Sequence, residues 1–245
     1  MKTNRIPIFL LFILTVAFLS CSDDNSPGGK SSNNNGGNNN TGGCAGGPTT
    51  VTDIDGNVYN VVSIGNQCWM KENLKTTHYK NGAAIPSNLT DAQWQATTSG
   101  ASADYNNDPT NTAIYGKLYN WYAVADPQGL CPTNWHVPTD AEFDTLFNYL
   151  GGDSVCGGAM KEIGTTHWDS PNTGATNSSG FTGLPGGYIN FLGTYDFIGY
   201  RGFWWSATQE SVPIAYTRLL SCDNSIVYRD ISNKSAGFSV RCVRD

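Results

Sequence analysis

The stretch "PTDAEFDTLFNYLGG", Pro138 to Gly152, predicts an amphipathic helix in the middle of the chain. Thr139 has the short hydroxyl side chain of a helix N-cap, and Glu142, three positions on, completes a capping box. Four apolar residues then recur at the i, i+3, i+4, i+7 spacing of one helix face: Phe143, Leu146, Phe147 and Leu150. Two glycines, 151–152, end the pattern. The stretch therefore predicts a helix with one face buried in a core.

Two shorter helices are expected on its N-terminal side. In "NLTDAQWQATT", Thr90 and Gln93 have the spacing of a second capping box. Between Tyr115 and Ala125, three apolar or aromatic residues are spaced for one helical face: Leu118, Tyr119 and Tyr122.

Strands are expected at both ends of the domain. "TVTDIDGNVYNVVSIG" predicts a hairpin with strands 51–54 and 58–64 on either side of a type I′ turn at Asp55-Gly56. "TRLLSCDNSIVYRD" predicts a second hairpin, around 223–225, and "GFSVRCVRD" a terminal strand whose alternate residues face opposite ways. Strands at the ends and helices in the middle indicate the α+β class.

The first twenty residues, 1–20, have the pattern of a lipoprotein signal peptide. Lys2 and Arg5 precede an apolar stretch too short to span a bilayer, and Phe18-Leu19-Ser20-Cys21 resembles a lipobox. We expect lipidation at Cys21; the alternative is an ordinary cleaved signal that leaves Cys21 free. The acidic residues that follow resemble the surface-export signal of Bacteroidota lipoproteins. The expected location is therefore the outer membrane, exposed at the cell surface, with the lipid anchor as the contact to the membrane.

Residues 21–48 follow as the lipidated Cys and a flexible tether, whose stretch rich in Gly, Asn and Ser, 22–43, has a typical reach of about 25 Å. Residues 49–245 are expected to form one extracellular domain. The whole sequence of 245 residues carries a net charge of −6, with only 14% charged and 12% aromatic residues. This composition excludes binding to nucleic acid and electrostatic binding to anionic membranes.

Six cysteines remain besides Cys21, an even number that predicts up to three disulfides in an exported domain. The expected pair is Cys131 with Cys242, which ties the middle of the domain to its last strand.

Six motifs in order resemble the Fibrobacter succinogenes major paralogous domain family: "DIDGNVYNVVSIGNQCWMKENL", "YGKLYNWYAV", "GLCPTNWHVPTDAEFDTL", "WDSPNTGATNSSGFTGLPGGY", "GFWWSAT" and "GFSVRCVRD". The resemblance runs from about Val51 to Asp245. It implies a C-type-lectin-like architecture, with a small twisted antiparallel sheet, two main helices and a long loop region. Similar proteins are secreted or lipid-anchored at bacterial surfaces and have no generally established activity. Cys68 and Cys156 depart from the family pattern.

Catalysis is not expected. The three histidines, His78, His136 and His167, lack zinc-binding spacing, and Ser206 lacks the Gly-x-Ser-x-Gly context of a nucleophile. The lectin-like architecture also hosts formylglycine-generating oxidases, but the redox cysteine pair of those enzymes has no counterpart that we can place here.

Calcium is the one cofactor for which the sequence offers candidate ligands. Asp169, Asn172 and Asn177 offer oxygen ligands close together. The favoured interpretation is that both asparagines form turns with their own backbone, so no cofactor is expected and calcium remains the alternative.

The segment from Thr165 to Pro213 holds ten aromatic residues and only four charges, which predicts an ordered segment. Adjacent Trp204 and Trp205 on one strand face opposite ways, so we expect only one of them in the core. The residues expected to face a ligand are Trp168, Asn172, Asn177, Tyr188, Tyr200 and Trp205. Rings and small polar groups of this kind suit a glycan, and they equally suit a protein surface. Two hypotheses follow: a surface-anchored module for adhesion or glycan recognition, and a structural or protein-interaction component of the cell envelope.

Overall fold

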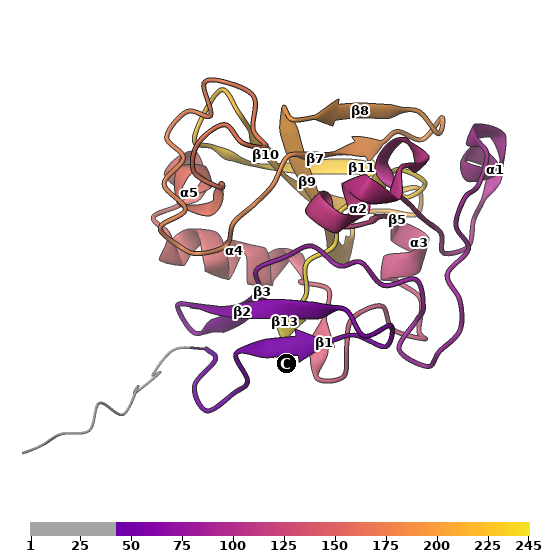
Figure 1. Ribbon diagram of the computed structural model, residues 1–245, viewed down its shortest axis with the longest axis horizontal. Helices are drawn as coiled ribbons and strands as arrows, with labels where there is room; N and C mark the ends of the chain where they lie inside the picture. The colour runs from indigo at the N-terminus through magenta and orange to yellow at the C-terminus, as the bar shows by residue number, and fades with distance from the viewer. Residues whose placement is uncertain (1–42) are drawn as a thin grey trace, which may run out of the picture. The chain divides into compact units, whose positions relative to one another are not determined.

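The computed structural model describes residues 43–245, which lie within one compact unit, Asn39–Asp245 (Figure 1). The expected signal peptide, the lipidation at Cys21 and most of the tether lie outside the described residues. Within residues 43–245, no helix is long and apolar enough to cross a membrane.

The strands are β1 Thr50–Thr52, β2 Val58–Ile64, β3 Gln67–Met70, β4 Ser102–Ala103, β5 Leu118–Asn120, β6 Trp135–His136, β7 Gly186–Ile189, β8 Tyr195–Ile198, β9 Arg201–Gln209, β10 Ile214–Ser221, β11 Val227–Asn233, β12 Gly237–Phe238 and β13 Val243–Arg244. The helices are α1 Asp91–Ala96, α2 Pro109–Tyr115, α3 Trp121–Val124, α4 Asp140–Tyr149 and α5 Asp153–Met160, with a 3₁₀ turn, η1, at Tyr105–Asn107. The domain is thus α+β and mostly sheet.

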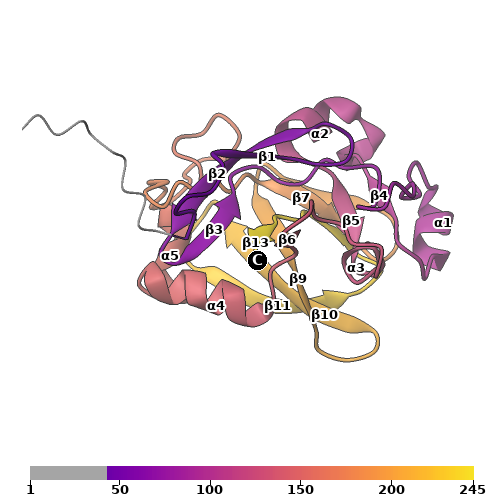
Figure 2. The same ribbon diagram turned by 90° about the horizontal axis from the view of Figure 1, so that it is seen from below.

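Two sheets organise these strands (Figures 1 and 2). The five-stranded sheet has the order β1-β2-β3-β13-β6 and is antiparallel throughout. The eight-stranded sheet has the order β11-β10-β9-β7-β12-β5-β4, with β8 paired to β7; its one parallel pair joins β7 to β9. The last strands of the chain belong to both sheets, β12 to the larger and β13 to the smaller.

Helix α4 is the helix that the sequence predicts. Thr139 Oγ1 accepts a hydrogen bond from the Glu142 N–H at 3.3 Å, and Glu142 Oε2 accepts one from the Thr139 N–H at 2.8 Å. The buried face holds Phe143, Leu146 and Phe147, and Phe143 lies 5.4 Å from the ring of Trp69 on β3. The capping box of α1 is also confirmed, with Thr90 and Gln93 as the reciprocal pair.

The helix expected from Tyr115 to Ala125 is wrong. Helix α2 ends at Tyr115, the chain continues as strand β5, and α3 begins only after Asn120. The break lies at Gly116, whose φ of +80° is unfavourable for other residues, and where a Cβ would lie 2.7 Å from the Cβ of Asn73. Tertiary contact with the segment at Asn73 therefore overrides the helical spacing.

Both predicted hairpins form, but the turn of the first differs from the expected one. Thr52 pairs with Val58, so five residues, 53–57, connect β1 to β2 instead of a two-residue turn. The side chain of Asp53 organises this loop, because it accepts hydrogen bonds from the Asp55 and Asn57 N–H groups and from the Tyr59 hydroxyl at 2.6 Å. The second hairpin joins β10 to β11, with Leu220 opposite Val227.

The C-terminal segment is not one half-exposed strand. Its two short pieces, β12 and β13, lie in different sheets, and both sets of alternate residues are buried, including Ser239 and Arg241. The expected alternation fails because this segment runs through the interior between the two sheets.

Trp204 and Trp205 are both buried, which corrects the expectation that only one of them belongs to the core. Their rings do face opposite sides of β9: Trp205 packs against Phe238 at 4.5 Å, and Trp204 against Phe181 at 5.8 Å. Each side of the strand is covered by its own hydrophobic cluster, so both faces are interior.

Two disulfides form among the six described cysteines. One is the expected pair, Cys131–Cys242, and the other joins Cys44 to Cys68. Cys156 and Cys222 are buried as free thiols, so the upper count of three disulfides is not reached.

Candidate ligand-binding groove

A groove of about 490 Å³ lies over the end of the β9–β10–β11 sheet, where the β10–β11 turn rises beside the sheet. Arg201 pairs with Ser221 across β9 and β10, and Leu219 pairs with Tyr228 across β10 and β11. These cross-strand neighbours therefore present their side chains to one side of the sheet. The groove lining includes Arg201, Leu219, Ser221, Asp223, Asn224, Tyr228 and Asp230.

Arg201 is the unpaired cation of the groove. Its guanidinium lies over the rings of Phe197 and Tyr200, at 4.6 and 5.3 Å from their centroids. Within residues 43–245 it makes no hydrogen bond or ion pair, and its Nε is buried without a partner. The other arginine of the lining, Arg229, is held by Asp140 at 2.9 Å. Arg201 is therefore the group with free donors for an incoming ligand.

The β10–β11 turn supplies the opposite charge. Asp223 Oδ2 accepts a hydrogen bond from the Tyr200 hydroxyl at 3.0 Å, and Asp223 Oδ1 accepts one from the Asn224 amide at 2.8 Å. The same amide donates to the Tyr228 hydroxyl at 3.0 Å. The hydrogen bond to Asp223 raises the pKa of Tyr200, because the carboxylate accepts from the protonated hydroxyl and disfavours the phenolate. The hydrogen bonds fix the two tyrosines beside the carboxylate.

Of the residues expected to face a ligand, Tyr200 contributes to this groove through Arg201 and Asp223. Tyr188 is half-buried and does not line the groove; its ring packs against those of Phe203 at 5.0 Å and Phe197 at 5.8 Å.

Trp168 and Trp205 cannot face a ligand, which corrects both predictions. Trp205 is 0% exposed and donates its indole N–H to the Tyr119 carbonyl. Trp168 is equally buried and donates to the Gly183 carbonyl. Both rings are core residues whose polar edge is satisfied by backbone.

Asn172 and Asn177 hold the long loop together. The Asn172 amide donates to the Glu162 carbonyl at 2.9 Å and to the Gly164 carbonyl. The Asn177 carbonyl oxygen accepts from the Thr182 N–H at 2.8 Å, and its amide donates to the Thr182 hydroxyl. Both amide nitrogens therefore have structural partners, whereas Asn172 Oδ1 is buried without a hydrogen-bond partner among the described residues. Within the same residues, no group of three or more His, Cys, Asp or Glu side chains is placed to hold a metal.

The sequence analysis missed Arg201, Asp223 and Tyr228. Arg201 begins the strand that carries Trp204. Tyr228 lies on a strand of the second predicted hairpin, and the alternation of side chains along that strand is the sequence signal that could have indicated it. Their proximity depends on the pairing of three strands, which the local sequence does not report.

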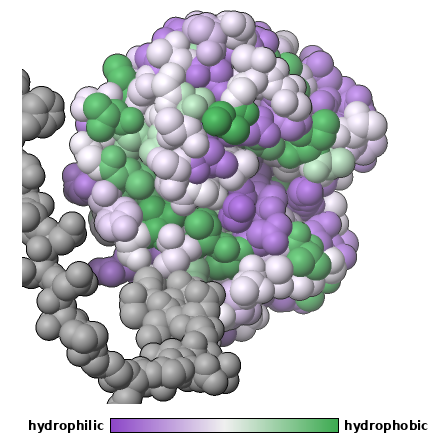
Figure 3. Space-filling model, turned by 60° about the vertical axis from the view of Figure 1, so that its left-hand side comes forward, coloured by the Kyte–Doolittle hydropathy of each residue, from purple (hydrophilic) through white to green (hydrophobic). Residues whose placement is uncertain are grey.

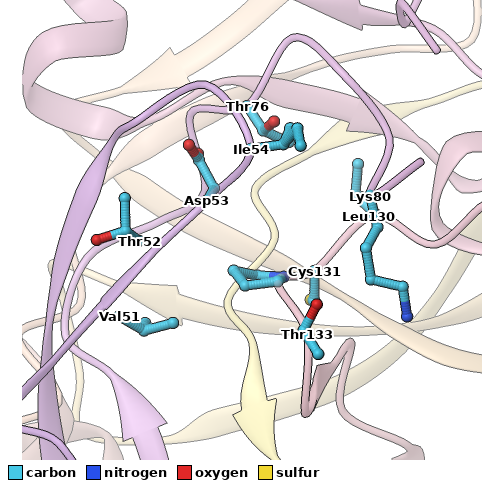
Figure 4. A pocket seen from close by; sticks show the side chains of 10 residues that line it. Val51, Thr52, Asp53, Ile54, Thr76, Lys80, Leu130, Cys131 and Thr133 are labelled. Carbon is cyan, nitrogen blue, oxygen red and sulfur yellow. The ribbon is translucent and has the colours of Figure 1, made fainter. Parts of the chain in front are cut away.

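A second cavity, of about 270 Å³, lies between the first hairpin and the 130–133 loop (Figure 4). Its carboxylate, Asp53, is already used by the hairpin turn, and Lys80 lies on the far side of the cavity from it in this view. The face drawn in Figure 3 intersperses hydrophobic and hydrophilic residues. The groove on β9–β11 is therefore the better candidate, because it combines a free cation with ring faces.

The described residues form a mixed α+β domain, mostly sheet, with two disulfides. The model of the Fibrobacter succinogenes major domain matches residues 62–244. The chain belongs to this family, as its ordered motifs indicated. No curated protein and no solved structure matches the chain.

Proposed function

We propose that this domain is a lectin-like, non-enzymatic binding module, anchored through a lipid at Cys21 and exposed at the outer-membrane surface, that recognises glycans through the β9–β11 groove. The observation that carries the proposal is the stacked, unpaired guanidinium of Arg201 beside Asp223 and two tyrosines. Recovery of the mature chain in the cytosol, without acylation at Cys21, would contradict the anchor.

The groups in the groove suit a polyhydroxylated ligand. Guanidinium and carboxylate groups offer donors and acceptors for neighbouring hydroxyls, and the exposed ring of Tyr228 offers an apolar face beside them. The lining holds two arginines, Arg201 and Arg229, and two aspartates, Asp223 and Asp230, so it has no excess of positive charge, which favours neutral sugars over strongly anionic ones.

A protein-interaction role is the second candidate. Phe191 and Leu192, at the β7–β8 turn, are 52% and 47% exposed, and adjacent exposed apolar residues of this size are typical of contacts with other proteins. A structural role in the cell envelope would use this turn rather than the groove.

An oxidase-like enzyme on the same architecture has less support. Such chemistry needs an accessible thiolate, whereas burial raises the pKa of Cys156 to about 12 and also raises that of Cys222.

A glycan array, read with and without a calcium chelator, tests the proposal. We expect binding that Arg201→Ala and Tyr228→Ala each weaken at least about tenfold, the loss typical of a charged hydrogen bond or a stacked ring. Tyr149→Ala is the matched control, because Tyr149 is an exposed aromatic residue that lies on α4 and does not line the groove. If no glycan on the array binds in either condition, glycan recognition is rejected. If only the replacement of Phe191 and Leu192 abolishes the capture of a protein partner, the protein-interaction role is favoured.

A further inference from the structure

Arg241 carries a buried charge without a carboxylate partner. The residue is 1% exposed, and within residues 43–245 no carboxylate oxygen lies within ion-pair distance of its guanidinium. Its Nε and Nη2 both donate to Asn73 Oδ1, at 3.1 and 2.7 Å, and its Nη1 donates to the Phe181 carbonyl. A guanidinium has five N–H donors, so two are left without a protein acceptor.

The surroundings hold this charge in place without an ion pair, although the Glu72 carboxylate nearby favours the charged form. The guanidinium lies 4.0 Å from the ring centroid of Phe181 and 5.7 Å from that of Trp204. Asn73 Oδ1 also accepts from the Trp204 indole N–H at 2.8 Å, so this one oxygen orients both side chains. Burying an ion in such a site is costly unless an opposite charge compensates it.

A pocket of about 150 Å³ opens beside this guanidinium, lined by Lys71, Glu72, Asn73, Thr182, Leu184 and Arg241 among others. The Lys71 ammonium makes no hydrogen bond or ion pair within the described part of the chain. Both carboxylate oxygens of Glu72 accept from Asn60, one from its N–H and one from its amide, each at 2.8 Å. Two cations therefore face one carboxylate that is already engaged, and the lining has an excess of positive charge.

We infer that this pocket binds a carboxylate, with Arg241 at its inner wall and Lys71 toward solvent. Guanidinium pairs with carboxylate through parallel N–H···O bonds, which the two free donors of Arg241 can supply. A volume of about 150 Å³ has room for a carboxylate and a few attached atoms, since a water molecule in the liquid takes about 30 Å³. Leu184 offers an apolar wall for the attached carbon atoms.

This site is separate from the groove on β9–β11, because the two share no lining residue. The inference therefore does not depend on the proposed glycan recognition. The carboxylate has two chemical sources: a free small acid, or the acid group of a uronic sugar whose ring stays outside the pocket.

Titration of the full-length protein, purified in detergent, with sodium acetate, sodium glucuronate and glucose tests the site by calorimetry and thermal unfolding, against sodium chloride at equal ionic strength. We expect acetate to bind and to raise the midpoint of unfolding more than chloride does. Tighter binding of glucuronate than acetate, with none of glucose, would identify a sugar acid as the source; the reverse order would identify a free small acid.

Lys71→Ala is the informative variant, because Lys71 is partly exposed and its removal leaves the interior intact, whereas replacing Arg241 endangers folding. We expect Lys71→Ala to weaken acetate binding by at least about tenfold. Lys80→Ala is the matched control, an exposed lysine outside this pocket, and is expected to bind as the wild type does. Equal responses to acetate and chloride, or equal affinities of Lys71→Ala and Lys80→Ala, would overturn the inference.

Discussion

Asp55 shows how one exposed turn residue holds two segments together. Its carboxylate accepts hydrogen bonds from the Thr77 N–H at 2.5 Å, from the Thr76 and Thr77 hydroxyls, and from the His78 ring nitrogen Nδ1. Partial burial alone would raise the pKa of Asp55, but these hydrogen bonds outweigh it and lower the pKa to about 2. The ionised form is therefore the one that the folded state prefers.

A carboxyl group with a lowered folded pKa stabilises the protein only while it is ionised. For Asp55 this contribution is complete above about pH 4 and is lost as the pH falls toward about 2, because only the folded state resists protonation. Asp55→Asn should therefore lower the free energy of unfolding at pH 7 and flatten the loss between pH 4 and pH 2. Urea unfolding at pH 7, 4 and 2.5 measures both effects.

Asp196→Asn is the control, since Asp196 is exposed and its side chain makes no hydrogen bond within residues 43–245. This substitution should leave the loss of unfolding free energy between pH 4 and pH 2 unchanged. An Asp55→Asn protein whose stability falls with pH as steeply as that of the wild type would show that other carboxyl groups control acid unfolding.

Among the elements, those whose signals are local could be predicted from the sequence. The capping boxes of α1 and α4 involve residues three positions apart, so nothing distant is needed to form them. Strand β5 could not be predicted, because its conformation follows from the close approach of Gly116 to Asn73, far away in the chain. Helix α5 was missed for a related reason: half of its buried residues are glycines, Gly157 and Gly158, and only Cys156 and Met160 give the buried face an apolar side chain.

The candidate site could be predicted only in part. The composition of its segment pointed to Tyr200, which contacts the lining residues Arg201 and Asp223 without lining the groove itself. Arg201, Asp223 and Tyr228 meet through strand pairing that a local pattern does not contain. The predictions for Trp168 and Trp205 were wrong because a count of aromatic residues does not distinguish a ring that faces solvent from a ring that is buried in a hydrophobic cluster. The buried charge of Arg241 has no sequence signal, since the lack of an acidic partner is a property of the fold.

Helix α4 gives a direct test of element packing. Phe147 is buried, its ring lies 5.8 Å from that of Phe143, and the Arg218 guanidinium lies 5.5 Å from its centroid. Phe147→Ala should lower the free energy of unfolding by about 3–5 kcal/mol, through the lost burial and the cavity left behind. Tyr149→Ala, on the same helix but 65% exposed, should cost less than about 0.5 kcal/mol. Similar losses for the two variants in urea unfolding would mean that α4 does not pack as the structure shows.

At the scale of the whole molecule, the C-terminal segment connects the two sheets. Gly237–Phe238 pairs in the larger sheet and Val243–Arg244 in the smaller one. Between them, the Val240 and Cys242 carbonyls accept hydrogen bonds from the Leu74 and Met70 N–H groups, at 2.8 and 3.1 Å. The Cys131–Cys242 disulfide fixes this segment to the chain 111 residues earlier, so it closes the loop that contains most of the larger sheet.

The two disulfides should therefore differ in their contribution to stability. All four cysteines are almost fully buried, so replacing either pair by alanine removes similar packing, and the main difference is the length of the closed loop. Loop entropy gives about 4.8 kcal/mol for the separation of 111 residues in Cys131–Cys242 and about 3.4 kcal/mol for the 24 residues in Cys44–Cys68.

Urea unfolding of the two double-alanine variants, compared with the wild type, should show the larger loss for Cys131–Cys242 by about 1.4 kcal/mol. The loops do not overlap in sequence, so the remaining disulfide does not compensate for the missing one. Equal losses, or a larger loss for Cys44–Cys68, would show that local packing around the sulfur atoms, rather than the constraint on the unfolded chain, sets what each disulfide contributes.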